Sequence, residues 1–188
     1  VPKGHAVRPT PDLVKQAVFN SLGTRVAGAA VLELFAGSGA LGLECLSRGA
    51  ARVVAVEKSM RHATVIRENL AALGLPGGAF ELRCQDVFAA VRQLREVGRP
   101  FHLVLADPPF GEKNVGYRSR SLSQALLDDA DLPALLEQPD GLLVLGHSCR
   151  DTLALPSTWV EIRALHHGDS VFRFLSPSLT KAAEPVLT

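Results

Sequence analysis

The sequence predicts an α/β fold in which a mostly parallel sheet carries helices on both faces and ends in an antiparallel hairpin. Short apolar runs alternate with segments of helical periodicity along most of the chain. These runs are continuously apolar, as is typical of strands buried on both faces in a parallel sheet. Near the C-terminus two strand-like runs are separated only by His167-Gly168-Asp169, which is too short for a parallel crossover.

The first predicted helix begins at Thr10-Pro11-Asp12, with Thr10 as N-cap, and ends before Gly23. The alternation that follows predicts, in chain order, strand 31–35, helix 40–47, strand 53–57, helix 59–73, strand 79–84, helix 87–97 and strand 101–106. An irregular stretch then leads to helix 121–136, strand 142–146 and the hairpin strands 159–166 and 170–175.

The chain has 188 residues, enough for one domain that buries about 70% of its unfolded surface. We expect a basic arm and helix in 1–25 packed on a main domain in 26–175. A loose tail is expected in 176–188, where Pro, Ser, Thr and Ala predominate. We expect a monomer.

No apolar run approaches the roughly 18 residues of a membrane span, and the first residues lack a secretion signal. Cys45, Cys84 and Cys149 fit reduced core thiols better than a disulfide framework. The six histidines lack the paired spacing of metal ligands, so we expect no metal. We therefore expect a cytoplasmic protein with no membrane contact.

A glycine-rich loop joins the first predicted strand to its helix. Gly37-Ser38-Gly39-Ala40-Leu41-Gly42 is a G-x-G-x-x-G motif, with Glu57 at the end of the next strand. Gly37 and Gly39 allow a close backbone approach, and Glu57 can accept two ribose hydroxyls. The motif suits S-adenosylmethionine or a dinucleotide equally, so an NAD(P)-dependent reductase remains an alternative.

Further candidates for cofactor binding lie beside this loop. A carboxylate at Glu33, in an apolar strand, needs donors or a cation. It can brace the loop or, through water, meet the ammonium of a methionine moiety. Asp86 can accept from an adenine amine while Val87 donates its N–H, although Asp86 equally fits a helix N-cap. We add Phe35 and Lys58, which flank the loop and Glu57.

The strand 101–106 ends in Asp107-Pro108-Pro109-Phe110. The Asp107 carboxylate and the Pro108 carbonyl are two acceptors for the two hydrogens of a planar exocyclic amine. Phe110 can stack on the attached base, which is worth about 1–3 kcal/mol. Such a tetrapeptide can also merely end a strand in a turn. Beside a cofactor loop it favours methyl transfer to a nucleobase amine, and a dehydrogenase gives no reason for it.

Motifs along nearly the whole chain resemble one family, the bacterial methyltransferases that modify a guanine N2 of 16S ribosomal RNA. They are Arg8-Pro9-Thr10, Val18-Phe19-Asn20, the segment 34–44, Ser47-Arg48-Gly49-Ala50, Val56-Glu57, Asp107-Pro108-Pro109-Phe110 and Gly168-Asp169. The resemblance implies a Rossmann-like class I methyltransferase fold, S-adenosylmethionine as donor with S-adenosylhomocysteine as product, and guanine 966 as target. It also implies a substrate within the 30S subunit or an assembly intermediate.

Two features depart from the family. The basic stretch before Arg8 is short, and Phe110 stands where many relatives have Tyr. The net charge of only +1 does not itself indicate a nucleic-acid binder. We nevertheless expect Arg8, Lys113, Arg118 and Arg120 to contact RNA. Because the amine clamp recognises a planar NH₂ group, an adenine N6 of DNA or RNA, or a protein amide, remains an alternative target.

Overall fold

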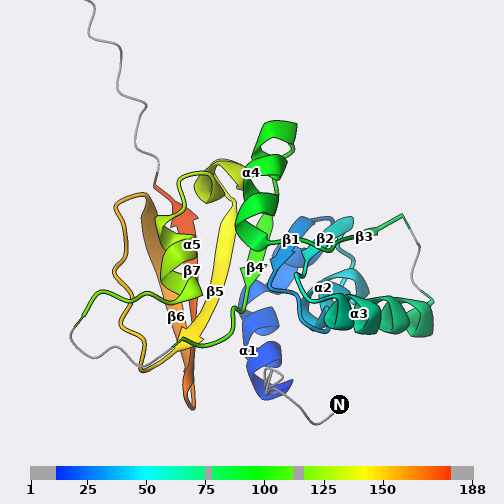
Figure 1. The fold of residues 1–188 in the computed structure, drawn as a ribbon, viewed down its shortest axis with the longest axis horizontal. Coiled ribbons are helices and arrows are strands. Elements are labelled where there is room, and N and C mark those ends of the chain that lie inside the picture. The colour runs from blue at the N-terminus through cyan, green and yellow to red at the C-terminus, as the bar shows by residue number, and fades with distance from the viewer. Residues whose placement is uncertain (1–11, 75–77, 112–116, 179–188) are drawn as a thin grey trace, which may run out of the picture.

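The computed structural model describes residues 12–74, 78–111 and 117–178. Its sheet has seven strands in the order β3-β2-β1-β4-β5-β7-β6 and twists from β6 on the left of Figure 1 to β3 on the right. The parallel strands are β1 (Ala30–Leu34), β2 (Arg52–Val56), β3 (Phe80–Arg83), β4 (Leu103–Ala106) and β5 (Leu142–Ser148). The antiparallel hairpin is β6 (Trp159–His167) and β7 (Ser170–Pro177). The predicted sheet is confirmed.

Helices cover both faces of this sheet. One face carries α1 (Asp12–Leu22), the 3₁₀ helix η1 (Gly23–Val26), α2 (Ala40–Ser47) and α3 (Met60–Leu73). The other carries α4 (Val87–Val97), α5 (Leu122–Asp128) and the 3₁₀ helix η2 (Leu132–Leu135). Adjacent residues of β1 serve the two cores, because side chains alternate along a strand. Val31 packs in the first core and Leu32 in the second.

The single helix predicted at 121–136 is wrong. Helix α5 ends at Asp128, because Asp129 adopts an extended backbone with ψ 122°. The Asp129 carboxylate then accepts the backbone N–H groups of Asp131 and Leu132, both at 2.9 Å. This local turn competes with helix continuation, as Asp side chains often do, and η2 begins after it.

Smaller differences occur at the ends of elements. Strand β7 runs to Pro177, which pairs with Trp159, so the first two residues of the predicted tail belong to the sheet. Cys45 is buried, but Cys84 and Cys149 are exposed, so the prediction of three core thiols is wrong for these two. Cys84 follows the edge strand β3 and Cys149 follows the end of β5, so both lie beyond the buried parts of their strands. All three thiols are free.

Within residues 12–74, 78–111 and 117–178, no helix is long and apolar enough to cross a membrane. The arm 1–11 and the tail from 179 lie outside the described residues.

Strand β5 carries a buried histidine whose protonation opposes folding. His147 Nδ1 lies 2.9 Å from the Ser148 carbonyl, and its Nε2 is buried without a hydrogen-bond partner among the described residues. Burial lowers the pKa of His147 from its ordinary value of 6.5, and the charge of Arg173 lowers it further, while Ser148 and Asp151 oppose this. As the pH falls, the unfolded chain therefore takes up this proton first.

We predict that the contribution of His147 to stability is lost as the pH drops below about 6.5 and through the folded pKa of this residue. His147→Gln cannot titrate, so its unfolding free energy should change less between about pH 7.5 and about pH 5.5. The difference is at most about 1.4 kcal/mol per pH unit. Urea unfolding of both proteins at the two pH values measures it. Equal pH dependence in both would contradict this assignment.

Candidate cofactor and substrate site

The candidate site lies where β1, β2 and β4 end. The two neighbours of β1 run parallel to it, and their last residues are in register, with Leu34 opposite both Val56 and Ala106. The chain continues from these ends into the glycine loop, into Glu57 and into Asp107. The three predicted groups therefore meet at the carboxyl edge of the sheet, where α/β folds bind ligands.

The glycine loop needs its glycines for backbone geometry and for space. Gly37 and Gly39 have φ values of 57° and 75°, in the left-handed region that favours glycine. A Cβ on Gly39 would lie 3.2 Å from the side chain of Ile66 in α3. Asn69, also in α3, donates from Nδ2 to the Ser38 carbonyl at 3.0 Å. Helix α3 therefore holds this loop in place.

Glu57 ties the end of β2 to the loop. It is 9% exposed, and its Oε2 accepts the Gly37 N–H at 2.7 Å. Its Oε1 accepts the Ser59 N–H, also at 2.7 Å, and lies 3.5 Å from His62 Nδ1. Each carboxylate oxygen has two lone-pair sites, so each keeps acceptor capacity for a ligand hydroxyl.

Glu33 is buried beneath α2. It is 2% exposed, and its Oε1 accepts the Leu41 N–H at 3.2 Å. A Cβ on Gly42 would lie 2.5 Å from Glu33 Oε2, so Gly42 lets α2 approach this carboxyl group. The structure thus contains the bracing contact that we expected as one role of Glu33, and contact with a ligand ammonium remains a prediction.

Burial raises the pKa of Glu33 from 4.5 to about 8. Backbone N–H groups of Gly42 and Leu41 oppose this shift, whereas the charges of Glu57 and Asp107 add to it. Glu33 and Glu57 thus both bind backbone N–H groups of the G-x-G-x-x-G segment, at Leu41 and Gly37.

Asp86 caps α4, which is one of its two predicted roles. Its Oδ1 accepts the N–H groups of Phe88 and Ala89 at 3.0 and 3.3 Å. Lys58 Nζ lies 3.8 Å from Asp86 Oδ2, and both side chains are exposed at the ends of β2 and β3. Val87 is buried. An adenine contact by Asp86 and Val87 remains a prediction.

Asp107 is half-buried, Pro108 is buried and Phe110 is 50% exposed. Asp107 lies against Gly146 of β5, where an added Cβ would overlap its carboxylate. The Gly146 carbonyl accepts from Ser123 Oγ at 3.1 Å, which fixes this part of β5 to α5. Gly146 was not among the predicted site residues, although a glycine within an apolar strand is a known sign of close approach by another group.

The predicted RNA-contacting residues are only partly described. Arg118 already pairs with Asp128, with its Nη2 at 2.7 and 2.8 Å from the two carboxylate oxygens. Arg120 is exposed. Arg8 and Lys113 lie outside the described residues. Phe35, the remaining predicted cofactor residue, follows β1 directly with an unusual φ of 57°.

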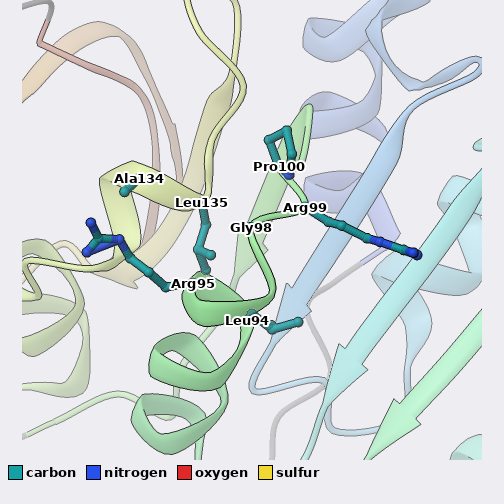
Figure 2. Close-up of a pocket in the computed structure, with 7 residues that line it drawn as sticks. All are labelled: Leu94, Arg95, Gly98, Arg99, Pro100, Ala134 and Leu135. Atoms are coloured by element: carbon teal, nitrogen blue, oxygen red, sulfur yellow. The ribbon is translucent and has the colours of Figure 1, made fainter.

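A surface pocket lies at the opposite edge of the sheet and belongs to no predicted site. It is lined by the end of α4, the residues before β4, and η2. Figure 2 shows Arg95 and Arg99 pointing away from each other there, and Arg95 pairs with Asp131 at 2.8 Å.

In the described part of the chain no three His, Cys, Asp or Glu residues are grouped to hold a metal ion. The absence of a metal remains a prediction.

Comparison with known proteins gives a consistent result. Residues 1–176 match the family model described as "Conserved hypothetical protein 95". The Bacillus subtilis protein named "Putative rRNA methyltransferase YlbH" is 34% identical over 144 residues, which are 77% of this chain and 73% of that protein. Ribosomal RNA small subunit methyltransferase D of Escherichia coli is 39% identical over 110 residues, 58% of this chain and 53% of that protein.

A solved Escherichia coli structure named "Putative methyltransferase yhhF" superposes with a TM-score of 0.68 at 30% identity. The match covers 92% of this chain and 88% of that one. The class I methyltransferase fold expected from the sequence is confirmed. The sequence match spans only about half the length of the Escherichia coli methyltransferase D.

We predict that Glu33 makes stability decrease as the pH rises. Its folded pKa of about 8 exceeds the ordinary 4.5, so its contribution is complete below about pH 4.5 and is lost as the pH rises through about 8. Glu33→Gln resembles the neutral acid and should lack this decrease, with a difference of about 1.4 kcal/mol per pH unit at most. Urea unfolding across this range tests it, and parallel curves would contradict it.

Proposed function

This chain belongs to the family described as Conserved hypothetical protein 95, and from that membership we propose that it is an S-adenosylmethionine-dependent methyltransferase acting on ribosomal RNA. The family expected from the resemblance is the family found. The observation that carries the proposal is the meeting of the glycine loop, Glu57 and Asp107 at one edge of the sheet. In this proposal the cofactor site at the loop and Glu57 lies beside an amine clamp at Asp107.

The residues present fit S-adenosylmethionine. Glu57 keeps free lone pairs for two ribose hydroxyls while its bonds to Gly37 and Ser59 hold it in place. Gly37 exposes its backbone, since the nearest atom to an added Cβ is the Phe35 carbonyl oxygen at 4.0 Å. Asp86 and Val87 would hold the adenine. The cofactor supplies an electrophilic methyl group on a sulfonium.

Asp107 and Pro108 would hold the amine that accepts the methyl group. Their oxygens accept its two hydrogens and orient the nitrogen lone pair, while Phe110 stacks on the base. Most of the rate acceleration comes from this positioning, for which effective molarities of about 10⁵ M or more are available. After transfer, the Asp107 carboxylate takes the proton that the methylated nitrogen loses.

The finer target is the exocyclic N2 of a guanine in 16S ribosomal RNA, at position 966 by the resemblance. The name of the Escherichia coli relative, a small-subunit methyltransferase, supports the small subunit as the source of the RNA, and the base and position rest on the resemblance. We propose the 30S subunit or an assembly intermediate as partner, a monomeric enzyme and a cytoplasmic location. Arg8, Lys113, Arg118 and Arg120 are the proposed RNA contacts, and the pairing of Arg118 Nη2 with Asp128 competes with a phosphate for this side chain.

Calorimetry distinguishes the cofactor alternatives. The purified protein should bind S-adenosylhomocysteine and should not bind NADPH, and the reverse result would favour the reductase.

Mass spectrometry of 16S ribosomal RNA from cells with and without the gene then identifies the base. Loss of N2-methylguanine supports the proposal, whereas loss of N6-methyladenine, or no change in ribosomal RNA, would favour the alternative targets.

We predict that Asp107→Ala reduces methyl transfer by at least about 100-fold and leaves S-adenosylhomocysteine affinity within about twofold. The variant loses one acceptor for the amine and keeps Glu57 and Glu33, whose carboxylates accept N–H groups of the glycine loop and of the start of α2. Single-turnover transfer assays and calorimetry measure the two effects. Asp140→Ala is the matched control, because Asp140 is exposed just before β5 at the opposite edge of the sheet. Transfer at the wild-type rate would refute the clamp.

A further inference from the structure

Glu57 has a side-chain neighbour that our sequence analysis did not single out. His62 lies in the first turn of α3, with Nδ1 3.5 Å from Glu57 Oε1. Its side chain is 34% exposed, whereas that of Glu57 is 11% exposed. The imidazole therefore covers the carboxylate while remaining accessible from solvent.

The start of α3 fixes this arrangement. Ser59 is the N-cap, and its Oγ accepts the His62 N–H at 3.4 Å, so His62 is the third residue of the helix. Side chains at this position turn back toward the N-cap, as Glu does in a capping box. Here the acid comes from the preceding strand instead. Glu57 satisfies the Ser59 N–H at 2.7 Å, and the imidazole approaches the same oxygen.

Other cations nearby have different partners or face solvent. Lys58 is 78% exposed and lies 3.8 Å from Asp86. Arg61 is exposed. In the described part of the chain, His62 is the basic side chain that lies within 4.0 Å of the Glu57 carboxylate, at 3.5 Å. Oε2 is held by the Gly37 N–H, so His62 and Ser59 together determine how Oε1 can turn.

We propose that His62 is a positioning residue for the ribose of the cofactor, an inference that rests on the proposed function. Its imidazole, with Nδ1 3.5 Å from Glu57 Oε1, limits the movement that the Gly37 and Ser59 hydrogen bonds leave to the carboxylate, so that the remaining lone pairs point to a vicinal diol. Without the imidazole, the carboxylate rotates more freely and loses part of the benefit of preorganisation. The effect of His62 on cofactor affinity therefore depends on the ribose hydroxyls of the ligand and not on the stability of α3.

The test measures the affinity of the full chain for S-adenosylhomocysteine and for its 2′-deoxy analogue. His62→Ala should weaken S-adenosylhomocysteine binding about three- to tenfold. Binding of the deoxy analogue should change less than twofold, because its sugar lacks one of the hydroxyls. His62→Asn, whose amide nitrogen replaces Nδ1, should restore most of the affinity. Glu68→Gln, at an exposed position of α3, is the control and should bind like wild type.

Two results would overturn the proposal. One is unchanged affinity of His62→Ala for S-adenosylhomocysteine, and the other is an equal loss for both ligands, which indicates only a disturbed helix.

An NMR measurement on the wild-type protein does not depend on the folding of a variant. The ¹⁵N resonance of His62 Nδ1 should shift on adding S-adenosylhomocysteine, while that of His102, at the opposite edge, should not, and no shift at His62 would also overturn it. Failure of the wild type to bind would instead refute the proposed function.

A catalytic readout separates positioning from chemistry. In His62→Ala the KM for S-adenosylmethionine should rise with the dissociation constant, whereas kcat at saturating cofactor should remain within about twofold of wild type, as expected for lost ground-state binding. A large loss of kcat with unchanged KM would contradict the proposal.

Discussion

The parallel pairing of β1 with β2 on one side and β4 on the other is the constraint on which the site depends. It aligns the ends of three strands that lie far apart in sequence, with Leu34 opposite both Val56 and Ala106. A shift of either pairing by one residue would turn every side chain of the shifted strand to the other core. These strands are continuously apolar and pack in two separate cores, which fixes their register. The register in turn determines the position of the glycine loop, of Glu57 and of Asp107.

The negative charge of the site at pH 7 is smaller than the number of its carboxyl groups suggests. Three carboxyl groups surround the loop, but burial raises the pKa of Glu33 to about 8, so this group is mostly neutral at pH 7. Its neutral form removes part of the repulsion with Glu57 and Asp107. Charged carboxylates therefore remain where backbone N–H groups or solvent stabilise them, at Glu57 and Asp107. The neutral carboxyl group of Glu33 lies beneath α2.

Local patterns predicted the parts of the site that depend on strand ends. The glycine loop, Glu57 and Asp107 follow apolar runs, and parallel strands place such ends together. Contacts that depend on side-chain direction were not predictable in this way. The turn at Asp129, the pairing of Arg118 with Asp128 and the closeness of Gly146 to Asp107 all arise from folded geometry. His62 had a usable signal, its position three residues after an N-cap.

The backbone conformation and the side-chain packing at Phe35 favour different residue types. Its backbone has a φ of 57°, which is unfavourable for a residue with a Cβ, and its ring packs on the core beneath α4 and α5. Glycine would relax the backbone but remove the ring, while a β-branched residue would increase the strain. Any substitution at this position therefore involves a trade-off, because relieving the backbone strain where the chain leaves the sheet loosens the packing beside the glycine loop.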